Sequence, residues 1–392
     1  MLKTRMRAKP VVVVLALLLV LSLAVYGCGK KKITSEEPYK IGAVLSLSGP
    51  NAPLGQPEER SLKLLQKQIN AEGGINGHRV TFIIEDDMSD PAKASTAIAK
   101  LITQDNVAAV IGSSGTGTTL AMAPIAEREK VAQVCCAAGT KITQPVNKWI
   151  FRTPPTDSMA IEKVLQYLKS NLKVSKIAIL HDANAFGVGG ADELTAKAPG
   201  KGVEIVTRES YGSTDVDMTT QLTKIKDTPA QALVVWGTNP GPAIITKNMQ
   251  QLGIKIPFVG SHGIANKKFI ELAGPAGNGV VFPAGRMLIP SSIPADSEWR
   301  KSVDEFIKDY KAAYNADPDT FAGHGWDAGL IITDAMKTAN TDRVQLRSQI
   351  EKTKDLAGIG GVFTYSPTNH DGLDVNDLIM VKVDNGAWTE VK

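Results

Sequence analysis

The fold is decided by the stretch Val107-Ala-Ala-Val-Ile-Gly-Ser-Ser-Gly-Thr-Gly-Thr-Thr119 and the residues that follow it. An amphipathic run extends from Thr119 to Lys130, and a second apolar run, Val131-Ala-Gln-Val-Cys-Cys136, comes directly after it. A β-branched strand, a glycine-rich turn, a helix and another strand in this order make one βαβ unit. Because two parallel strands need a crossover of this kind, the stretch predicts a parallel sheet covered by helices.

The same alternation extends over most of the chain. Continuous apolar strands such as Ala232-Leu-Val-Val-Trp236 suit sheets that are covered on both faces. Strands lie in similar numbers on both sides of Arg152-Thr-Pro-Pro155, which predicts an α/β fold of two doubly wound parallel-sheet lobes with a ligand cleft between them. The expected strands are 40–47, 79–85, 107–111, 131–136, 176–181, 203–209, 232–236, 257–259, 280–283 and 378–383, and the expected helices are 58–71, 92–104, 119–130, 161–172, 218–226, 243–251, 298–314, 321–339 and 344–354.

The N-terminus has the pattern of an export signal. Four basic residues lie within residues 1–10, residues 11–25 are dominated by apolar side chains, and Gly27-Cys28 follow. So short an apolar run, without a stop-transfer cluster, is typical of a signal peptide, and a retained membrane anchor is the alternative. The pattern resembles the bacterial lipoprotein signal, although Tyr26 stands where that signal usually has a small residue. The resemblance implies removal of residues 1–27, lipidation of Cys28, a polar tether over 28–38 and a periplasmic or cell-surface location.

Net charge and cysteine content limit the kinds of partner and of chemistry that the chain can have. The chain has 44 Lys and Arg against 40 Asp and Glu, and the four basic residues ahead of Cys28 leave with the signal, so the remaining chain is neutral. No broad basic surface remains, and we expect no nucleic-acid partner. Cys135 and Cys136 are adjacent, and a bridge between neighbours is strained, so we expect small buried strand residues rather than a redox pair.

Two loops at predicted strand ends carry hydrogen-bond donors. Gly112-Ser-Ser-Gly-Thr-Gly-Thr-Thr119 opens a helix, and its amides and threonine hydroxyls make a site for an anion, most economically a carboxylate. It lacks the Lys-Ser/Thr pair of a phosphate loop. A capped strand-to-helix turn without a ligand is the alternative. Ala137-Ala-Gly-Thr140 follows the next strand, so both loops can converge on one ligand.

No catalytic or metal-binding pattern stands out. The histidines are scattered, without metal-ligand spacing, and Gly260-Ser-His-Gly263 does not have the spacing of a nucleophile elbow. His181-Asp182 and Asp86-Asp87 lie at strand ends, where acid-base or metal chemistry is conceivable, but loop-edge and capping roles fit them better. We therefore expect a binding protein rather than an enzyme, without a metal or cofactor.

Several strings in this order and spacing resemble the branched-chain amino-acid-binding proteins of bacterial ABC importers, and the resemblance covers nearly the whole chain after Cys28. The strings are Ile41-Gly-Ala-Val-Leu-Ser-Leu-Ser-Gly-Pro50, Ile69-Asn-Ala-Glu-Gly-Gly-Ile-Asn-Gly77, Asp86-Asp87, Val110-Ile-Gly112, Phe151-Arg-Thr153, His181-Asp182 and Gly260-Ser-His-Gly-Ile-Ala-Asn266. The resemblance implies the type I periplasmic-binding-protein fold, in which two lobes joined by three crossovers close over a small molecule. It places lobe 1 at 39–153 with about 287–365, and lobe 2 at 154–286 with about 366–392.

The resemblance also implies a set of ligand-binding residues. Thr116, Thr118 and Thr119 correspond to groups that hold the ligand carboxylate. The second loop corresponds to the site of a carbonyl and further donors, and Leu54 to an apolar wall. Phe186 and Thr238 correspond to cleft residues of the second lobe. The full expected set is Leu54, Thr116, Thr118, Thr119, Ala137, Gly139, Thr140, Phe186, Thr238 and His262.

His262 is the largest departure from the family pattern. The family usually has an acidic residue there to bind the ligand ammonium, and an imidazole does not supply that negative charge. The residue therefore favours an aromatic or oxo-acid carboxylate as an alternative to a branched-chain amino acid. The function implied is a monomeric, lipid-anchored solute-binding protein that delivers a small carboxylate to an ABC permease. A ligand sensor for a membrane receptor shares these sequence features and is the other alternative.

Overall fold

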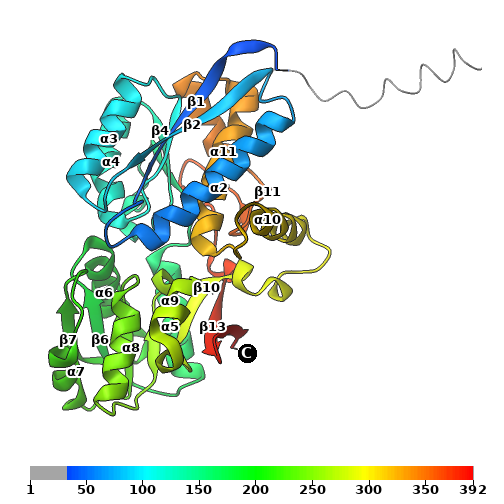
Figure 1. Ribbon diagram of the computed structural model, residues 1–392. Helices are drawn as coiled ribbons and strands as arrows, with labels where there is room; N and C mark the ends of the chain where they lie inside the picture. The colour runs from blue at the N-terminus through cyan, green and yellow to red at the C-terminus, as the bar shows by residue number, and fades with distance from the viewer. Residues whose placement is uncertain (1–32, 392) are drawn as a thin grey trace, which may run out of the picture.

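The computed structural model describes residues 33–391, and two sheets with their helices dominate it (Figure 1). The predicted signal peptide, Cys28 and most of the tether lie outside these residues. The strands are β1 (Ser35–Leu45), β2 (His78–Asp86), β3 (Ala109–Gly112), β4 (Ala132–Cys135), β5 (Ile150–Arg152), β6 (Lys176–Asp182), β7 (Glu204–Tyr211), β8 (Ala232–Trp236), β9 (Phe258–Gly260), β10 (Val281–Gly285), β11 (Leu356–Ala357), β12 (Val362–Phe363), β13 (Leu378–Asp384) and β14 (Ala387–Glu390).

The helices separate the strands as the alternation predicts. They are α2 (Ala52–Ala71), α3 (Pro91–Thr103), α4 (Thr116–Arg128), α5 (Asp157–Ser170), α6 (Ala185–Lys197), α7 (Thr219–Lys226), α8 (Gly241–Gln251), α9 (Lys267–Ala273), α10 (Glu298–Tyr314), α11 (Thr320–Ala339) and α12 (Arg343–Glu351). Most boundaries agree with the sequence to within three residues. The largest shift is in α2, which begins six residues earlier than expected because Pro53 and Pro57 are accommodated at its start and in its interior.

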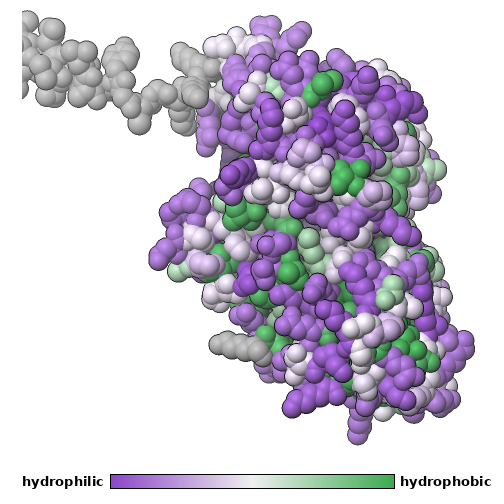
Figure 2. Space-filling model, turned by 180° about the vertical axis from the view of Figure 1, so that it is seen from behind, coloured by the Kyte–Doolittle hydropathy of each residue, from purple (hydrophilic) through white to green (hydrophobic). Residues whose placement is uncertain are grey.

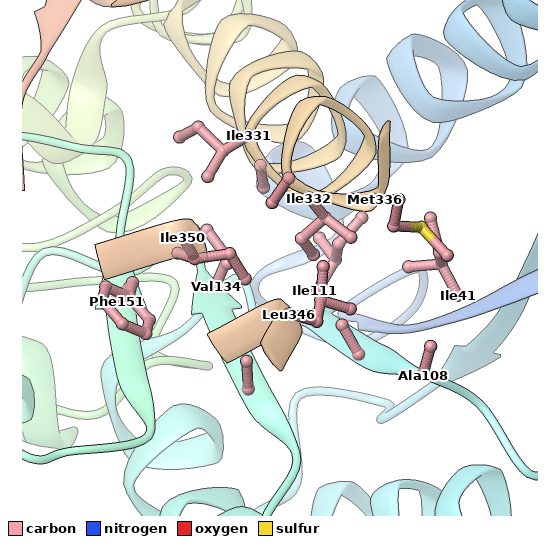
Figure 3. Packing of buried hydrophobic residues seen from close by; sticks show 14 of the residues in the cluster. Ile41, Ala108, Ile111, Val134, Phe151, Ile331, Ile332, Met336, Leu346 and Ile350 are labelled. Carbon is pink, nitrogen blue, oxygen red and sulfur yellow. The ribbon is translucent and has the colours of Figure 1, made fainter. Parts of the chain in front are cut away.

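The first sheet has the strand order β2-β1-β3-β4-β5, with every pair parallel. In the described part of the chain, α2, α11 and α12 contribute to the core on one face, and α3 and α4 to the core on the other. Figure 3 shows Ile332 and Met336 of α11 packed toward Ile111 and Ile41 of the strands. These side chains are fully buried, so this apolar contact is a large contribution to the stability of the first lobe.

The second sheet has the order β14-β13-β10-β9-β8-β6-β7. Strands β6 to β10 are parallel, whereas β13 pairs antiparallel with β10 and β14 antiparallel with β13. Helices α5 and α6 cover one face, and α7, α8 and α9 cover the other. The prediction of parallel sheets is therefore correct for the first sheet, but the second has an antiparallel edge, and β14 and α9 were absent from the expected elements.

Helix α6 was also missed, and its composition explains why. Gly187, Gly189 and Gly190 lower its helix propensity. Packing requires at least one of them, since a Cβ on Gly190 lies 2.0 Å from Nε1 of Trp236. The tertiary contact with Trp236 therefore selects glycine in a segment whose local preference is weak.

The chain passes between the two sheets three times. It leaves the first sheet after β5, returns to it after β10, and enters the second sheet again at β13. Between the second and third passages, α11 and α12 pack on the first sheet. Figure 1 shows the result as an upper and a lower lobe, with the C-terminus beside the lower one.

Polar residues cover most of the face seen in Figure 2, and apolar ones are more frequent around the middle and lower parts. None of the helices within residues 33–391 has both the length and the apolar character that crossing a membrane requires.

Candidate functional site

A cavity of about 240 Å³ lies where the strand order reverses in both sheets. In the first sheet β1 lies between β2 and β3, and in the second β6 lies between β7 and β8. Loops after these strands face each other across the cavity, as is usual for ligand sites in open α/β sheets. The main lining residues are Asn51, Leu54, Ser114, Thr116, Thr118 and Ala138 from the first lobe, Asn184, Phe186, Thr238 and His262 from the second, and Phe321 and His324 from α11.

The N-terminus of α4 forms the donor-rich end of the cavity. Its N-cap residue is Gly115, so no side chain caps the first amides of the helix. Thr116 Oγ1 is buried and has no hydrogen-bond partner among the described residues. Uncapped amides and a free hydroxyl at the start of a helix of 13 residues favour a bound anion.

The other two threonines of this loop have structural roles. The hydroxyl of Thr118 donates to Ser113 Oγ at 2.7 Å or to the Gly115 carbonyl at 2.9 Å. The hydroxyl of Thr119 donates to the Ser113 carbonyl at 3.1 Å, and Thr119 does not line the cavity. The cluster of three hydroxyls expected from the sequence therefore leaves Thr116 as the unengaged one.

The second loop surrounds the buried guanidinium of Arg152. Its Nη1 donates to the Ala138 carbonyl at 2.7 Å, and its Nη2 donates to the Gly139 carbonyl at 2.8 Å. Arg152 Nε lies 3.1 Å from Asp371 Oδ1, which balances the charge. Ala137 and Gly139 do not line the cavity, and only Ala138 of this loop does. The loop carbonyls are therefore occupied by a cation of the protein itself.

Thr140 and Gly139 instead lie beside the cavity, in a neighbouring groove between α4 and α6. The Thr140 hydroxyl donates to Glu193 Oε2 at 2.7 Å and accepts from the Ser158 amide at 3.1 Å. A Cβ on Gly139 lies 2.4 Å from Cγ2 of Thr116, so glycine allows the two loops to approach. The two hydrogen bonds of Thr140 connect the lobes, whereas the Gly139 contact joins two loops of the first lobe.

Aromatic rings form the wall that the second lobe contributes. The ring centroids of Phe186 and His262 are 5.6 Å apart at 80°, and those of Trp236 and His262 are 5.9 Å apart at 72°. Edge-to-face contacts of this kind hold the imidazole in a fixed orientation. Thr238 donates to Asn51 Oδ1 at 3.3 Å, which adds a further contact between the lobes.

Two neutral imidazoles lie in the cavity, one from each lobe. Burial lowers the pKa of His262 to about 3, helped by the positive charge of Arg152. Burial likewise lowers the pKa of His324 to about 3, helped by His262. Both ring nitrogens of His262 and Nδ1 of His324 have no hydrogen-bond partner among the described residues. Polar atoms that are buried and unpaired in this way are available to a ligand.

Acidic residues lie behind the cavity wall and not on it. Burial raises the pKa of Asp157 to about 8, and its Oδ1 is 3.7 Å from His262 Nε2, too long for a hydrogen bond. Burial raises the pKa of Glu58 well above its usual range, and Glu58 accepts a hydrogen bond from Ser114. Asp182 accepts from Ser213 Oγ and the Asn184 amide. Among the described residues, no Asp, Glu, Lys or Arg lines the cavity.

The structure thus brings six of the ten expected site residues together. Leu54, Thr116, Thr118, Phe186, Thr238 and His262 line the cavity, whereas Thr119, Ala137, Gly139 and Thr140 do not.

Sequence reasoning missed Asn51, Ser114, Phe321 and His324. Ser114 lay within the loop already singled out and could have been included. Phe321 and His324 come from a helix some 200 residues further along the chain, and no local signal marks them.

In the described part of the chain, no group of three or more His, Cys, Asp and Glu side chains is placed to hold a metal ion. Cys135 and Cys136 are both free and buried, as expected. Cys135 ends β4, whereas Cys136 follows the strand and lines the cavity.

A family model described as "Periplasmic binding protein" matches residues 38–387. Among curated proteins, the chain is 26% identical over 315 residues to a Leu/Ile/Val-binding protein homolog of Brucella suis, covering 80% of this chain and 82% of that one. It is 27% identical over 305 residues to a leucine-, isoleucine-, valine-, threonine- and alanine-binding protein of Pseudomonas aeruginosa, covering 77% of this chain and 79% of that one.

Solved structures show the same fold. An extracellular ligand-binding receptor from Rhodopseudomonas palustris HaA2 superposes with a TM-score of 0.85 at 31% identity, covering 91% of this chain and all of that one. A branched-chain amino acid transporter substrate-binding protein from Streptococcus pneumoniae, in complex with isoleucine, superposes with a TM-score of 0.81 at 26% identity, covering 91% and 100%. These neighbours confirm the expected two-lobed α/β fold.

Proposed function

Because this chain belongs to the periplasmic binding protein family, a family of ligand binders rather than enzymes, we propose that it is the extracytoplasmic solute-binding protein of an ABC import system. It binds a hydrophobic amino acid of the branched-chain type or a related small carboxylate and delivers it to a membrane permease. Relatives named for leucine, isoleucine and valine binding support the choice of ligand class. An aromatic or oxo acid is the alternative ligand.

The observation that carries this proposal is the uncapped N-terminus of α4 in a cavity shared by both lobes. Within residues 33–391, no side chain caps the first amides of α4 and the buried hydroxyl of Thr116 has no hydrogen-bond partner, and both border the cavity. A carboxylate satisfies them and interacts favourably with the helix dipole. The walls formed by Leu54, Phe186 and Phe321 suit an apolar ligand body.

Binding acts through closure of the two lobes. Contacts from both sides stabilise the closed form, and that form is the one the permease recognises. We assign lobe 1 to residues 39–153 with about 287–365, and lobe 2 to 154–286 with about 366–392. This division is supported by the three passages of the chain between the sheets.

Replacing Thr116 by valine tests the carboxylate site. The change keeps the shape but removes one donor, so binding of the best carboxylate in a panel of leucine, isoleucine, 2-oxo-4-methylpentanoate and benzoate weakens by about 1–3 kcal/mol in calorimetry. Thr195→Val is the matched control, because Thr195 is exposed and its hydroxyl bonds only within α6. Equal affinities of wild type and Thr116→Val remove Thr116 from the site.

The lipid anchor is a separate part of the proposal and rests on the sequence of residues 1–28. Replacing Cys28 by alanine removes the acylated thiol, so the variant no longer incorporates a labelled fatty acid and no longer fractionates with membranes. Several acyl chains on one residue anchor firmly, so the wild type stays with the membrane fraction. Equal incorporation of label by both proteins contradicts the proposal.

A ligand sensor that signals through a membrane receptor has the same cavity but a different partner. Deletion of the neighbouring permease genes separates the two functions. For a transport protein, uptake of the bound carboxylate is lost in the deletion strain. For a sensor, uptake persists and the signalling response remains.

A further inference from the structure

The cavity has donors at one end, and none of the residues within 33–391 that line it carries a fixed charge. This combination restricts the ligand. The α4 end suits a carboxylate, as proposed above. The remaining lining residues in the described part of the chain are apolar, amide, hydroxyl or imidazole groups. An α-amino acid also brings an ammonium group, which needs a negative charge or several free carbonyl groups once it is buried.

Within residues 33–391 no carboxylate lines this cavity, and Asp157 and Glu193 line the neighbouring groove that shares Thr116 with it. Asp157 lies behind His262 and also accepts from Trp236 Nε1 at 3.3 Å. Glu58 is bonded to Ser114, and Asp182 to Ser213. None of the three lines the cavity.

Two carbonyl groups of the second loop, which adjoins the donor-rich end, are also occupied. The Ala138 carbonyl accepts from Arg152 Nη1 at 2.7 Å and from the Asp157 amide at 3.0 Å, which uses both of its lone pairs. The neighbouring Gly139 carbonyl accepts from Arg152 Nη2. A second cation at this loop meets the buried charge of Arg152 instead of a free acceptor.

The histidines offer the complementary chemistry. His262 is 9% exposed and His324 is 7% exposed, and both carry unpartnered ring nitrogens. A neutral imidazole has one N–H donor and one nitrogen acceptor. A hydroxyl group of the ligand can bond to either, and a carbonyl oxygen of the ligand can accept from the N–H. The two rings come from opposite lobes, so a group that bonds to both also stabilises closure.

We propose that the ligand is a small carboxylate without an amino group, carrying a hydroxyl or oxo oxygen that binds between His262 and His324. This inference rests on the proposed carboxylate site at α4 and narrows the ligand class of that same site. The carboxylate is held by the α4 amides and Thr116, and the apolar body lies against Phe186 and Phe321. His262 is then the residue that determines specificity against amino acids.

Three ligands that differ only at one carbon provide the test: leucine, 2-hydroxy-4-methylpentanoate and 2-oxo-4-methylpentanoate. Benzoate and 4-hydroxybenzoate form a second pair that compares an aromatic body with and without a hydroxyl. Calorimetry on the purified protein at pH 7.5 is expected to give at least one oxygen-substituted acid a Kd 100-fold or more below that of leucine, because an unpaired buried ammonium weakens binding by about two to four decades.

Two variants assign the preference to His262. His262→Glu supplies the missing negative charge, so leucine binding improves by about tenfold or more relative to the hydroxy acid. His262→Gln keeps a neutral donor and acceptor, and the preference for the hydroxy acid over leucine persists. The unfolding midpoints of both variants establish whether they are folded. If His262→Glu does not fold, the ligand preference of His262→Gln is the test.

The outcomes separate this inference from the proposed function. Tighter binding of leucine than of every amine-free acid overturns the inference and leaves the carboxylate site in place. Failure of all five probes to bind overturns both. A preference for the hydroxy acid that is unchanged in His262→Glu removes His262 as the cause and overturns its assigned role.

Discussion

The N-termini of α4 and α6 face the same cavity from opposite lobes, and they differ in how their first amides are capped. The N-cap residue of α6 is Asn184, whose side chain accepts from the Gly187 amide at 2.9 Å. The N-cap residue of α4 is Gly115, which has no side chain to accept from the helix amides. A helix start that is capped by its own sequence is stable without a ligand, whereas an uncapped buried start is stabilised by one.

The difference divides the work of recognition between the lobes. The first lobe supplies the free donors, so it holds the charged end of the ligand. The second lobe supplies Phe186, Trp236 and His262, whose mutual ring contacts fix a shaped wall. His324 of α11 is the exception, because it places an imidazole on the first-lobe side, next to the one from the second. The experiments below test this division, from the largest expected effect to the smallest.

Replacing His324 by glutamine alters the pH dependence of stability. The wild-type ring stays neutral when folded, with a pKa of about 3, but takes up a proton when unfolded below pH 6.5. The stability that it contributes is therefore present at pH 7.5 and is lost as the pH falls from 6.5 toward 3. Between pH 7.5 and 5 the wild type loses roughly 2 kcal/mol more than the variant in urea unfolding. Parallel stability curves would falsify burial of a neutral His324.

A side-chain cap on α4, like the one on α6, tests directly whether the first amides of α4 bind the ligand. In Gly115→Asn the new side chain accepts from the amides that the ligand needs, and the φ of −102° at this position suits asparagine. The Cβ lies 2.8 Å from Asn51 Nδ2 and 3.1 Å from Thr118 Oγ1, both ends of side chains that can shift by a few tenths of an ångström. Affinity for the best-bound carboxylate falls at least about tenfold, or about 1.4 kcal/mol, without loss of stability. Unchanged affinity shows that the carboxylate does not bind these amides.

Removing the cap from α6 is expected to lower the stability of the protein more than its affinity for the ligand. Asn184→Ala leaves the Gly187 amide without its acceptor, which costs about 1 kcal/mol of stability. Affinity for the same carboxylate falls less than in Gly115→Asn, because the polar atoms of the Asn184 side chain, although it lines the cavity, are engaged by the Gly187 amide and Ser213. Chemical unfolding and calorimetry on the same preparation measure both quantities. A loss of affinity with unchanged stability would show that Asn184 contacts the ligand. It would contradict the idea that only the first lobe binds the carboxylate.

Thr140→Val weakens a contact between the lobes outside the cavity. The variant loses the hydrogen bond to Glu193 of α6 and the one from the Ser158 amide. Since both form across the lobe boundary, closure becomes less favourable, and affinity falls by about threefold, near the lower end of a single hydrogen bond. Thr195→Val, on the exposed side of α6, is the control. A larger loss than in Thr116→Val indicates that Thr140 contacts the ligand.

The sequence predicted the fold well where apolar runs are long and periodic. Strand β8 and helix α10 occupy the residues expected of them, since continuous burial and a regular amphipathic face both leave a clear pattern. Helix α6 was not predicted because its three glycines weaken the helical pattern. Strand β5 was not predicted because its three residues are too few to show an alternating pattern. In those segments tertiary packing overrides local preference.

Prediction of the site was limited by a different cause. The strand-end loop pointed to Thr116 and the family resemblance to Phe186 and His262, and the structure places all three beside one cavity. The sequence motifs did not reveal which hydroxyls are free, because Thr118, Thr119 and Thr140 are engaged by partners that only folding brings near. Nor did they reveal that Arg152 takes up the carbonyl groups of the second loop.

By itself, the sequence determined the alternation of strands and helices, the two donor-rich loops and the imidazole at position 262, since these depend on local composition and periodicity. Tertiary packing alone leaves Thr116 as the free hydroxyl and brings His324 and His262 to one cavity, and within residues 33–391 it places no charged residue on the cavity wall. Hydrogen-bond satisfaction and burial depend on neighbours far apart in the chain, and a linear pattern does not record them.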